Sequence, residues 1–277
     1  MIYFCQVDTD REDALKQVEI LERSFNSVGQ SGKLVIVKTG NYKAKYQKLN
    51  LDLNYPVYKR HIALIEYIEK NNLFNEDIMI LDPDMFFNKK FDVGIIKENK
   101  LYATQWIVNH IVDLEDLPGI LQRLKDLKIT SNNTSFIPFA APYYGKGKLI
   151  YEISKIHLNI DRYLRSSHFI KNRWITEMYS LSIAPSVSGY ETIYHNLSLY
   201  SNIHDANIQT YQSLPIIHYY SKLISLSSDP SSGRKWVFIS KYDMGNYEKM
   251  KIAINGFHYP VDDYSKYMLP YYKEWFK

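Results

Sequence analysis

The chain has 277 residues, of which 45% are hydrophobic and 23% charged, values that are ordinary for a globular protein. A net charge of +4 is too small to diagnose a nucleic-acid-binding protein, and a single cysteine excludes an internal disulfide framework. There is no apolar run of the ~18 residues that span a bilayer, and the start, MIYFCQVDTD, lacks the pattern of a signal peptide. The chain is also rich in tyrosine, as proteins encoded by AT-rich genomes often are. These features together favour a protein located in the cytoplasm of a bacterium or of a phage-infected cell.

The first third of the chain alternates between strand and helix patterns. Residues 2–7 and 33–40 are predicted strands, and between them a helix through Ser27 is expected to be capped by Thr9 or Asp10. Its apolar stripe is spaced for one helix face and comprises Leu15, Val18, Leu21 and Phe25.

A second helix and a third strand follow. Residues 57–72 form the predicted helix, with His61, Leu64, Ile65 and Ile68 on one face and Asn71 and Asn72 at its end. Residues 77–87, DIMILDPDMFF, form the predicted strand. This order implies parallel crossovers and an α/β fold, in which ligands bind at the carboxyl ends of the strands. Asp8, Gly40 and the pair Asp82 and Asp84 fall at such ends.

Asp82 and Asp84 flank Pro83 at the end of an apolar run. In an extended segment, residues two apart point to the same side, and proline stiffens the pair. Two carboxylates there make a hard-oxygen site for Mn²⁺ or Mg²⁺ that leaves positions open for substrate phosphates. The alternative is a Pro-Asp turn with solvated acids.

His218 ends a short apolar run in LPIIHYYSK (214–222) and is the candidate third ligand. Imidazole suits Mn²⁺ better than Mg²⁺. A lone histidine in such a run is more often a satisfied core residue, and that alternative stays open at this point.

Together these motifs resemble those of metal-dependent GT-A nucleotide-sugar glycosyltransferases. Several blocks, in order, resemble the hydroxyproline O-arabinosyltransferases and peptidyl-serine α-galactosyltransferases of plants: residues 55–87, 139–155 (a proline-containing turn before a helix), 173–184 (RWITEMYSLSIA), 216–221 (IIHYYS) and 235–241 (KWVFISK). The chain departs from that pattern at Met85, where those arabinosyltransferases carry histidine, and at Arg173, where glycine is usual. The resemblance implies a GT-A type, Rossmann-like, mostly parallel sheet flanked by helices.

We accordingly expect a GT-A domain over residues 1–255 and an aromatic-rich extension over 256–277 that packs on it. The resemblance implies a UDP-sugar donor, arabinose favoured, and transfer with retention. Asp84 is then the direct metal ligand and a catalytic residue, Asp82 contacts the metal or the ribose, and His218 completes the ligand set. The residues expected to bind the donor are Asp82, Lys59, Thr9 and Lys241.

Glu177 is the other catalytic candidate, as nucleophile, base or anchor of the acceptor hydroxyl. It is expected on a helix, sharing a face with Trp174 and Leu181. The alternative is an exposed ion pair with Arg173 four residues earlier.

Hydroxymethylated cytosine in DNA is the leading acceptor, because residues 41–48, NYKAKYQK, interleave tyrosines with lysines as nucleic-acid-binding segments do. The expected acceptor contacts are Trp174, Tyr143, Tyr144, Lys43 and Lys45, although each aromatic is also a candidate core residue and each lysine a candidate solvated one. A protein or glycan hydroxyl is the alternative acceptor. A non-catalytic module that binds nucleotide sugar or nucleic acid is the alternative of another class.

Overall fold

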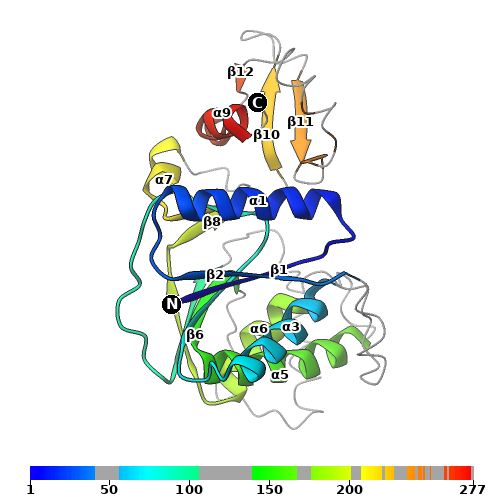
Figure 1. Ribbon diagram of the computed structural model, residues 1–277, viewed down its shortest axis with the longest axis vertical. Coiled ribbons are helices and arrows are strands. Elements are labelled where there is room, and N and C mark those ends of the chain that lie inside the picture. The colour runs from blue at the N-terminus through cyan, green and yellow to red at the C-terminus, as the bar shows by residue number, and fades with distance from the viewer. Residues whose placement is uncertain are drawn as a thin grey trace. The chain divides into compact units, whose positions relative to one another are not determined.

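Figure 1 shows a computed structural model of the chain. The structure describes residues 1–40, 56–105, 139–166, 176–200, 207–219, 222–227, 236–240, 243–244, 246, 250, 259–260 and 262–275. The chain divides into two compact units. The first comprises Met1–Gln6, Gly32–Leu81 and Val93–Asn196, and the second comprises Val7–Ser31, Asp82–Asp92 and Leu197–Lys277.

A six-stranded sheet with the strand order β2-β1-β3-β6-β5-β7 forms the centre of the first unit. Its strands are β1 (Ile2–Val7), β2 (Lys33–Lys38), β3 (Asp77–Leu81), β5 (Lys100–Gln105), β6 (Phe139–Lys146) and β7 (Glu191–His195). β1 runs parallel to β3 and β5 runs parallel to β7, whereas β6 is antiparallel to both of its neighbours. The predicted α/β fold class, a sheet with parallel pairs and flanking helices, is confirmed, and its GT-A type stays a prediction.

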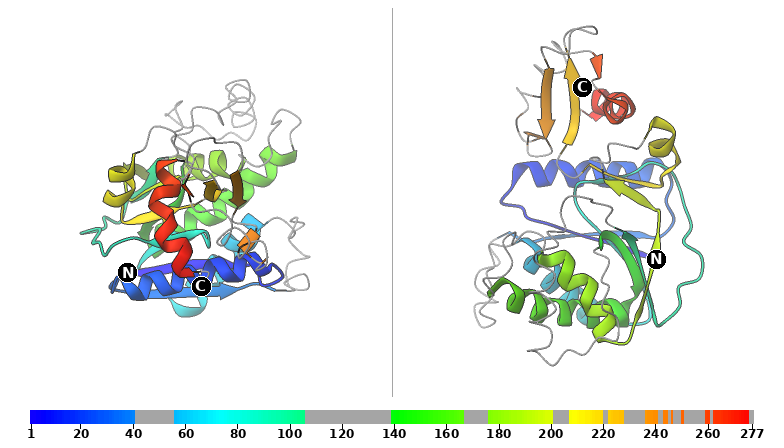
Figure 2. Two further views of the ribbon diagram at one scale, coloured as in Figure 1. Left: turned by 90° about the horizontal axis from the view of Figure 1, so that it is seen from above. Right: turned by 180° about the vertical axis from the view of Figure 1, so that it is seen from behind.

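Three helices of the first unit pack side by side: α3 (Pro56–Asn71), α5 (Gly147–Ser166) and α6 (Thr176–Val187) (Figures 1 and 2). α5 contacts both of the others. α6 is buried on all sides, since every residue from Thr176 to Pro185 is buried. Its serine, threonine and glutamate side chains therefore need partners inside the protein, because a buried polar group without one is costly.

The second unit contains two small sheets, with the orders β4-β9-β8 and β11-β10-β12. Its elements are α1 (Glu12–Ser27), β4 (Met85–Phe87), β8 (Ser198–Tyr200), α7 (Ile208–Ser213), β9 (Ile216–His218), β10 (Lys222–Ser227), β11 (Trp236–Ser240), β12 (Tyr259–Pro260) and α9 (Asp263–Trp275). α1 packs on β4, and α9 packs on β10 and α7.

An aromatic core holds the second unit together. It gathers side chains from β4, α7, β9 and α9, among them Phe86, Tyr211, Tyr219, Tyr272 and Trp275. The described part of the predicted extension, 259–260 and 262–275, belongs to this unit, and α9 supplies the largest share of its core. The boundary at residue 255 itself stays a prediction.

Several local predictions are wrong. The strand predicted over 77–87 is broken: β3 ends at Leu81, residues 82–84 form a turn, and β4 begins at Met85 in a different sheet. Because Asp82 and Asp84 lie in a turn, the argument from an extended backbone does not apply to them. The predicted proline-containing turn lies within the strand β6, where the pairing with β5 is irregular at Ala141 and Pro142.

Two predictions about the first helix also fail. α1 begins at Glu12 with Arg11 at its N-cap and without a side-chain cap, so neither Thr9 nor Asp10 caps it. Acidic residues in the first turn, Glu12 and Asp13, favourably complement the helix dipole there. Leu15 is 38% exposed, so only the other three members of the predicted apolar stripe are buried.

Candidate metal centre

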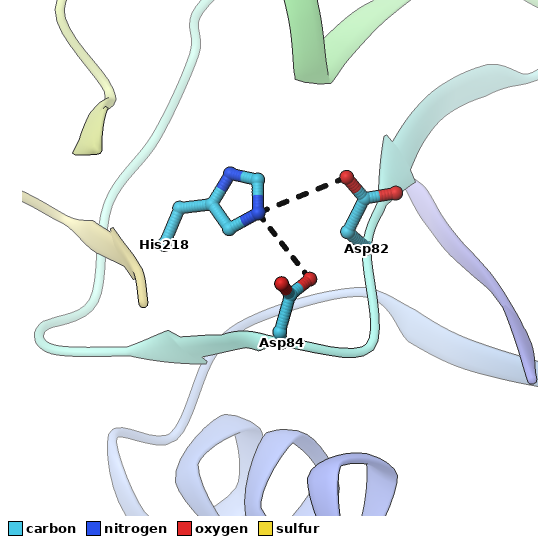
Figure 3. A group of neighbouring side chains, drawn as sticks. All are labelled: Asp82, Asp84 and His218. Atoms are coloured by element: carbon cyan, nitrogen blue, oxygen red, sulfur yellow. Dashed lines mark ion pairs between the residues drawn. The ribbon is translucent and has the colours of Figure 1, made fainter. Parts of the chain in front are cut away.

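Two carboxylates and an imidazole converge within the second unit (Figure 3). Asp82 and Asp84 lie in the turn between β3 and β4, and His218 is the last residue of β9. Nε2 of His218 lies 3.3 Å from Oδ1 of Asp84 and 3.8 Å from Oδ2 of Asp82. One ligand atom from each residue lies within 4.8 Å of the other two, so the three side chains could hold one metal ion.

Strand pairing brings the three residues together. β4 pairs antiparallel with β9, and Met85 lies directly opposite His218. The backbone N–H of Tyr219 donates to the carbonyl oxygen of Asp84 at 3.1 Å, which extends the pairing by one step into the turn. The residues of both strands are fully buried. Burial of these apolar strands therefore places the imidazole beside the second carboxylate.

This cluster is more deeply buried than charged side chains usually are. Asp84 is 3% exposed and His218 is 2% exposed, whereas the Asp82 side chain keeps 20% of its surface. Two carboxylates near each other in a buried site are unfavourable unless a positive charge compensates them. A divalent cation would supply that charge, and the Asp82 side chain is the part of the cluster that solvent reaches most.

The donor set and spacing fit a small divalent cation. In octahedral coordination at ~2.1 Å, adjacent ligand atoms are ~3.0 Å apart and opposite ones ~4.2 Å apart. The separations of 3.3 and 3.8 Å from Nε2 lie within that range. Carboxylate oxygens suit both Mg²⁺ and Mn²⁺, and the imidazole nitrogen favours Mn²⁺.

Glu177 lies at the start of α6 in the first unit and forms an ion pair with Arg60 of α3. The two side chains are only about a tenth exposed, at 10% and 11%. The predicted helix is confirmed at this position, but the partner comes from another helix. Arg173, the partner considered from sequence, lies outside the described residues.

The remaining predicted site residues are dispersed. Lys59 is partly buried on α3, and Thr9 is partly buried beyond β1. Tyr143 and Tyr144 are 1% and 5% exposed within β6, and Tyr144 stacks on Tyr102 with ring centroids 4.9 Å apart. The burial of both tyrosines agrees with the core alternative.

Four predicted contacts fall outside the described residues: Trp174, Lys241, Lys43 and Lys45. The same holds for the whole Tyr/Lys segment 41–48. The donor and acceptor functions assigned to these residues stay predictions.

Sequence reasoning missed Arg60 and Asn88. The signal for Arg60 was present in YKRH (58–61), where the resemblance directed attention to Lys59 instead. Asn88 directly follows β4 and contacts two other segments, as described below. An asparagine after a strand ordinarily indicates only a turn.

Comparison with known proteins finds no matching family model and no matching curated protein. Among solved structures, the chain is similar to a glycosyltransferase involved in the glycosylation of the major capsid of PBCV-1. The TM-score is 0.48 and the identity 12%, over 90% of this chain and 98% of that chain. Neither the donor nor the acceptor of this chain follows from a likeness of this degree.

Within the part of the chain that the structure describes, we find no helix with the length and apolar character needed to cross a bilayer.

Proposed function

We propose that this protein is a metal-dependent glycosyltransferase that moves a sugar from a UDP-sugar to a hydroxyl group. The observation that carries the proposal is the cluster of Asp82, Asp84 and His218, whose ligand atoms lie within 4.8 Å of one another. Asp82 directly follows β3, a strand of the α/β sheet that runs parallel to β1, and the carboxyl ends of parallel strands are where such sheets bind ligands. Arabinose is the sugar favoured by the sequence resemblance.

The chemistry assigns a separate task to each ligand. Asp84 and His218 are buried at the paired strands β4 and β9, so they would fix the position of a cation. Asp82 is more exposed and can meet the cation or a ribose hydroxyl. A bound divalent cation supplies electrostatic stabilisation of the diphosphate leaving group as the glycosidic bond breaks.

Glu177 is the proposed nucleophile, base or hydroxyl anchor of a retaining transfer, a role that rests on the resemblance of residues 173–184. Its ion pair with Arg60 compensates the buried negative charge and restricts the orientation of the carboxylate. Replacing Glu177 by glutamine preserves the size of the side chain and removes the charge. A catalytic carboxylate predicts a loss of turnover of about 10²-fold or more in this variant, at unchanged Mn²⁺ affinity.

The acceptor is proposed from sequence alone. Hydroxymethylated cytosine in DNA comes first because of the Tyr/Lys segment 41–48, and a protein or glycan hydroxyl comes second. A duplex base would have to be flipped out of the stack to reach a buried site.

The test is a UDP-release assay with Mn²⁺ that crosses a panel of UDP-sugars with four acceptors: hydroxymethylcytosine DNA, plain DNA, hydroxyproline peptides and serine peptides. Release that depends on metal and on one acceptor supports the proposal and identifies the acceptor. Asp84→Ala should abolish this release, whereas Asp92→Asn, an exposed carboxylate of the same unit, should not affect it.

A non-catalytic binding module gives a different pattern. It would bind Mn²⁺ and UDP-sugar in a titration and release no UDP with any acceptor. Turnover of Asp84→Ala near that of the wild type would also contradict the proposal.

A further inference from the structure

Asn88 connects β4 to the segment that leads into β9. Its backbone N–H donates to the carbonyl oxygen of Pro215 at 2.8 Å. Its side-chain Nδ2 donates to the carbonyl oxygens of Leu214, at 2.8 Å, and of Tyr211, at 3.2 Å. One residue thus satisfies several backbone acceptors around the C-terminal end of α7 and the start of β9.

The other end of the same amide is held by the C-terminal helix. Oδ1 of Asn88 accepts hydrogen bonds from the hydroxyls of Tyr267, at 2.5 Å, and Tyr271, at 2.9 Å, both on α9. Because both donors reach the oxygen and backbone carbonyls face the nitrogen, only one orientation of the amide satisfies every partner. The two tyrosines of α9 therefore fix the amide orientation with which Asn88 hydrogen-bonds to the segment between α7 and β9.

These hydrogen bonds affect the metal site because they help to fix the register in which β4 pairs with β9. β4 and β9 share three residue pairs, of which Met85 opposite His218 is the last, next to Asp84. A shift of one residue would turn His218 to the other face of the sheet. Three pairs provide little resistance to such a shift. The hydrogen bonds of Asn88 secure the opposite end of this short ladder, where Phe87 pairs with Ile216.

Aromatic side chains of α9 also pack against the middle of β4, between Asp84 and Asn88. The ring of Phe86, which lies midway between Asp84 and Asn88, is 5.0 Å from the ring of Tyr271 and 5.1 Å from that of Trp275. Aromatic rings at such separations attract one another in addition to the effect of their burial. α9 therefore contacts β4 both at its middle and at its end.

We propose that Asn88, oriented by Tyr267 and Tyr271, is a positioning residue for the metal centre, and that α9 thereby supports metal affinity. The inference deepens the proposed function, because it takes Asp82, Asp84 and His218 as the metal ligands. It assigns the C-terminal helix a role in the site, beyond packing on the domain.

The test compares two tyrosine-to-phenylalanine changes on the same helix. Tyr267→Phe with Tyr271→Phe removes both hydroxyls that hold Asn88 and keeps both rings. Tyr272→Phe is the matched control, because the hydroxyl of Tyr272 donates to the carbonyl oxygen of Met250 instead. For the full-length protein and each variant, the Mn²⁺ dissociation constant is measured by calorimetric titration and Tm by circular dichroism.

Loss of a hydrogen bond made directly to a metal ligand typically lowers affinity 10- to 100-fold, and Tyr267 and Tyr271 act on the ligands indirectly, through Asn88, so the low end of that range applies. We expect Mn²⁺ affinity about tenfold weaker in the double variant and within about twofold of the wild type in Tyr272→Phe. If the double variant does not fold, Tyr271→Phe alone carries the same comparison, with a smaller expected loss.

The possible failures are distinguishable. A wild-type protein that does not bind Mn²⁺ overturns the proposed metal centre and the positioning role with it. Wild-type binding that persists unchanged in the double variant overturns the positioning role alone. Equal losses of affinity in the double variant and in Tyr272→Phe would also overturn it, because they would reflect general destabilisation.

Discussion

Arg60 and Glu177 form a nearly buried ion pair between α3 and α6, although they lie 117 residues apart in the chain. Removing one member of a buried pair leaves an uncompensated charge, which typically costs 3–5 kcal/mol, whereas replacing both members by apolar residues is often close to neutral. We therefore expect Arg60→Met to lower the free energy of unfolding by about 3 kcal/mol.

The double variant Arg60→Met, Glu177→Met should recover most of that loss. Denaturant unfolding of the wild type, both single variants and the double variant completes a double-mutant cycle. Additive losses in the double variant would show that the two side chains contribute to stability independently.

Metal binding should raise the thermal stability of the protein. Since a ligand that binds only the folded state at 100 times its dissociation constant stabilises by about 2.7 kcal/mol, saturating Mn²⁺ should raise Tm measurably. Asp84→Asn should abolish the rise, and chelation should reverse it in the wild type. Asp92→Asn should keep it, and a rise of equal size in Asp84→Asn would place the metal elsewhere.

Two buried histidines predict a loss of stability in mild acid. His61 and His157 lie with ring centroids 4.2 Å apart, and Ser154 Oγ is 3.1 Å from Nδ1 of His61. Burial is the largest cause that lowers the pKa of both rings well below the usual value. Nearby positive charge lowers the pKa further, from His157 and Arg60 for His61 and from Arg60 and Arg165 for His157. The folded state therefore keeps them neutral at a pH at which the unfolded chain takes up protons.

The direction of the pH dependence follows from the unfolded chain, which binds more protons than the folded protein in mild acid. The contribution of each of these histidines to stability is constant above pH ~6.5 and falls as the pH decreases below it, by about 1.4 kcal/mol per pH unit. We expect His157→Gln to reduce the slope of the unfolding free energy between pH 6.5 and 5 by that amount. Ser154→Ala should lower stability without changing the slope. A slope unchanged in His157→Gln would mean that this ring titrates alike in both states.

Gly147, the first residue of α5, should not tolerate a side chain. A Cβ built there would lie 1.9 Å from the carbonyl oxygen of Leu73, a backbone atom that cannot turn aside. Overpacking of this kind costs 1–3 kcal/mol or more, so we expect Gly147→Ala to destabilise by about 3 kcal/mol.

Gly145→Ala is the control for this prediction, because its nearest neighbour is the flexible end of Leu149 at 3.1 Å. Thermal unfolding of both variants makes the comparison. Equal Tm values for the two variants would contradict the predicted clash.

Local patterns indicated the strand that leads to Asp82 and the short apolar run that ends at His218. The apolar run before Asp82 and the short run ending at His218 both form strands, because continuous burial selects such sequences. Their positions at strand ends also indicated where a ligand could bind. These inferences need only the side-chain preferences of neighbouring residues.

Long-range packing settled the rest, since it depends on segments that are distant in sequence. No local pattern could show that Asp84 precedes a separate strand, which pairs with the strand of His218 more than 130 residues later. The same applies to Arg60 beside Glu177, and to the tyrosines of α9 that hold Asn88. Which polar groups meet is decided when the apolar faces of the helices and strands are buried together, because each buried charge or amide must then find a partner.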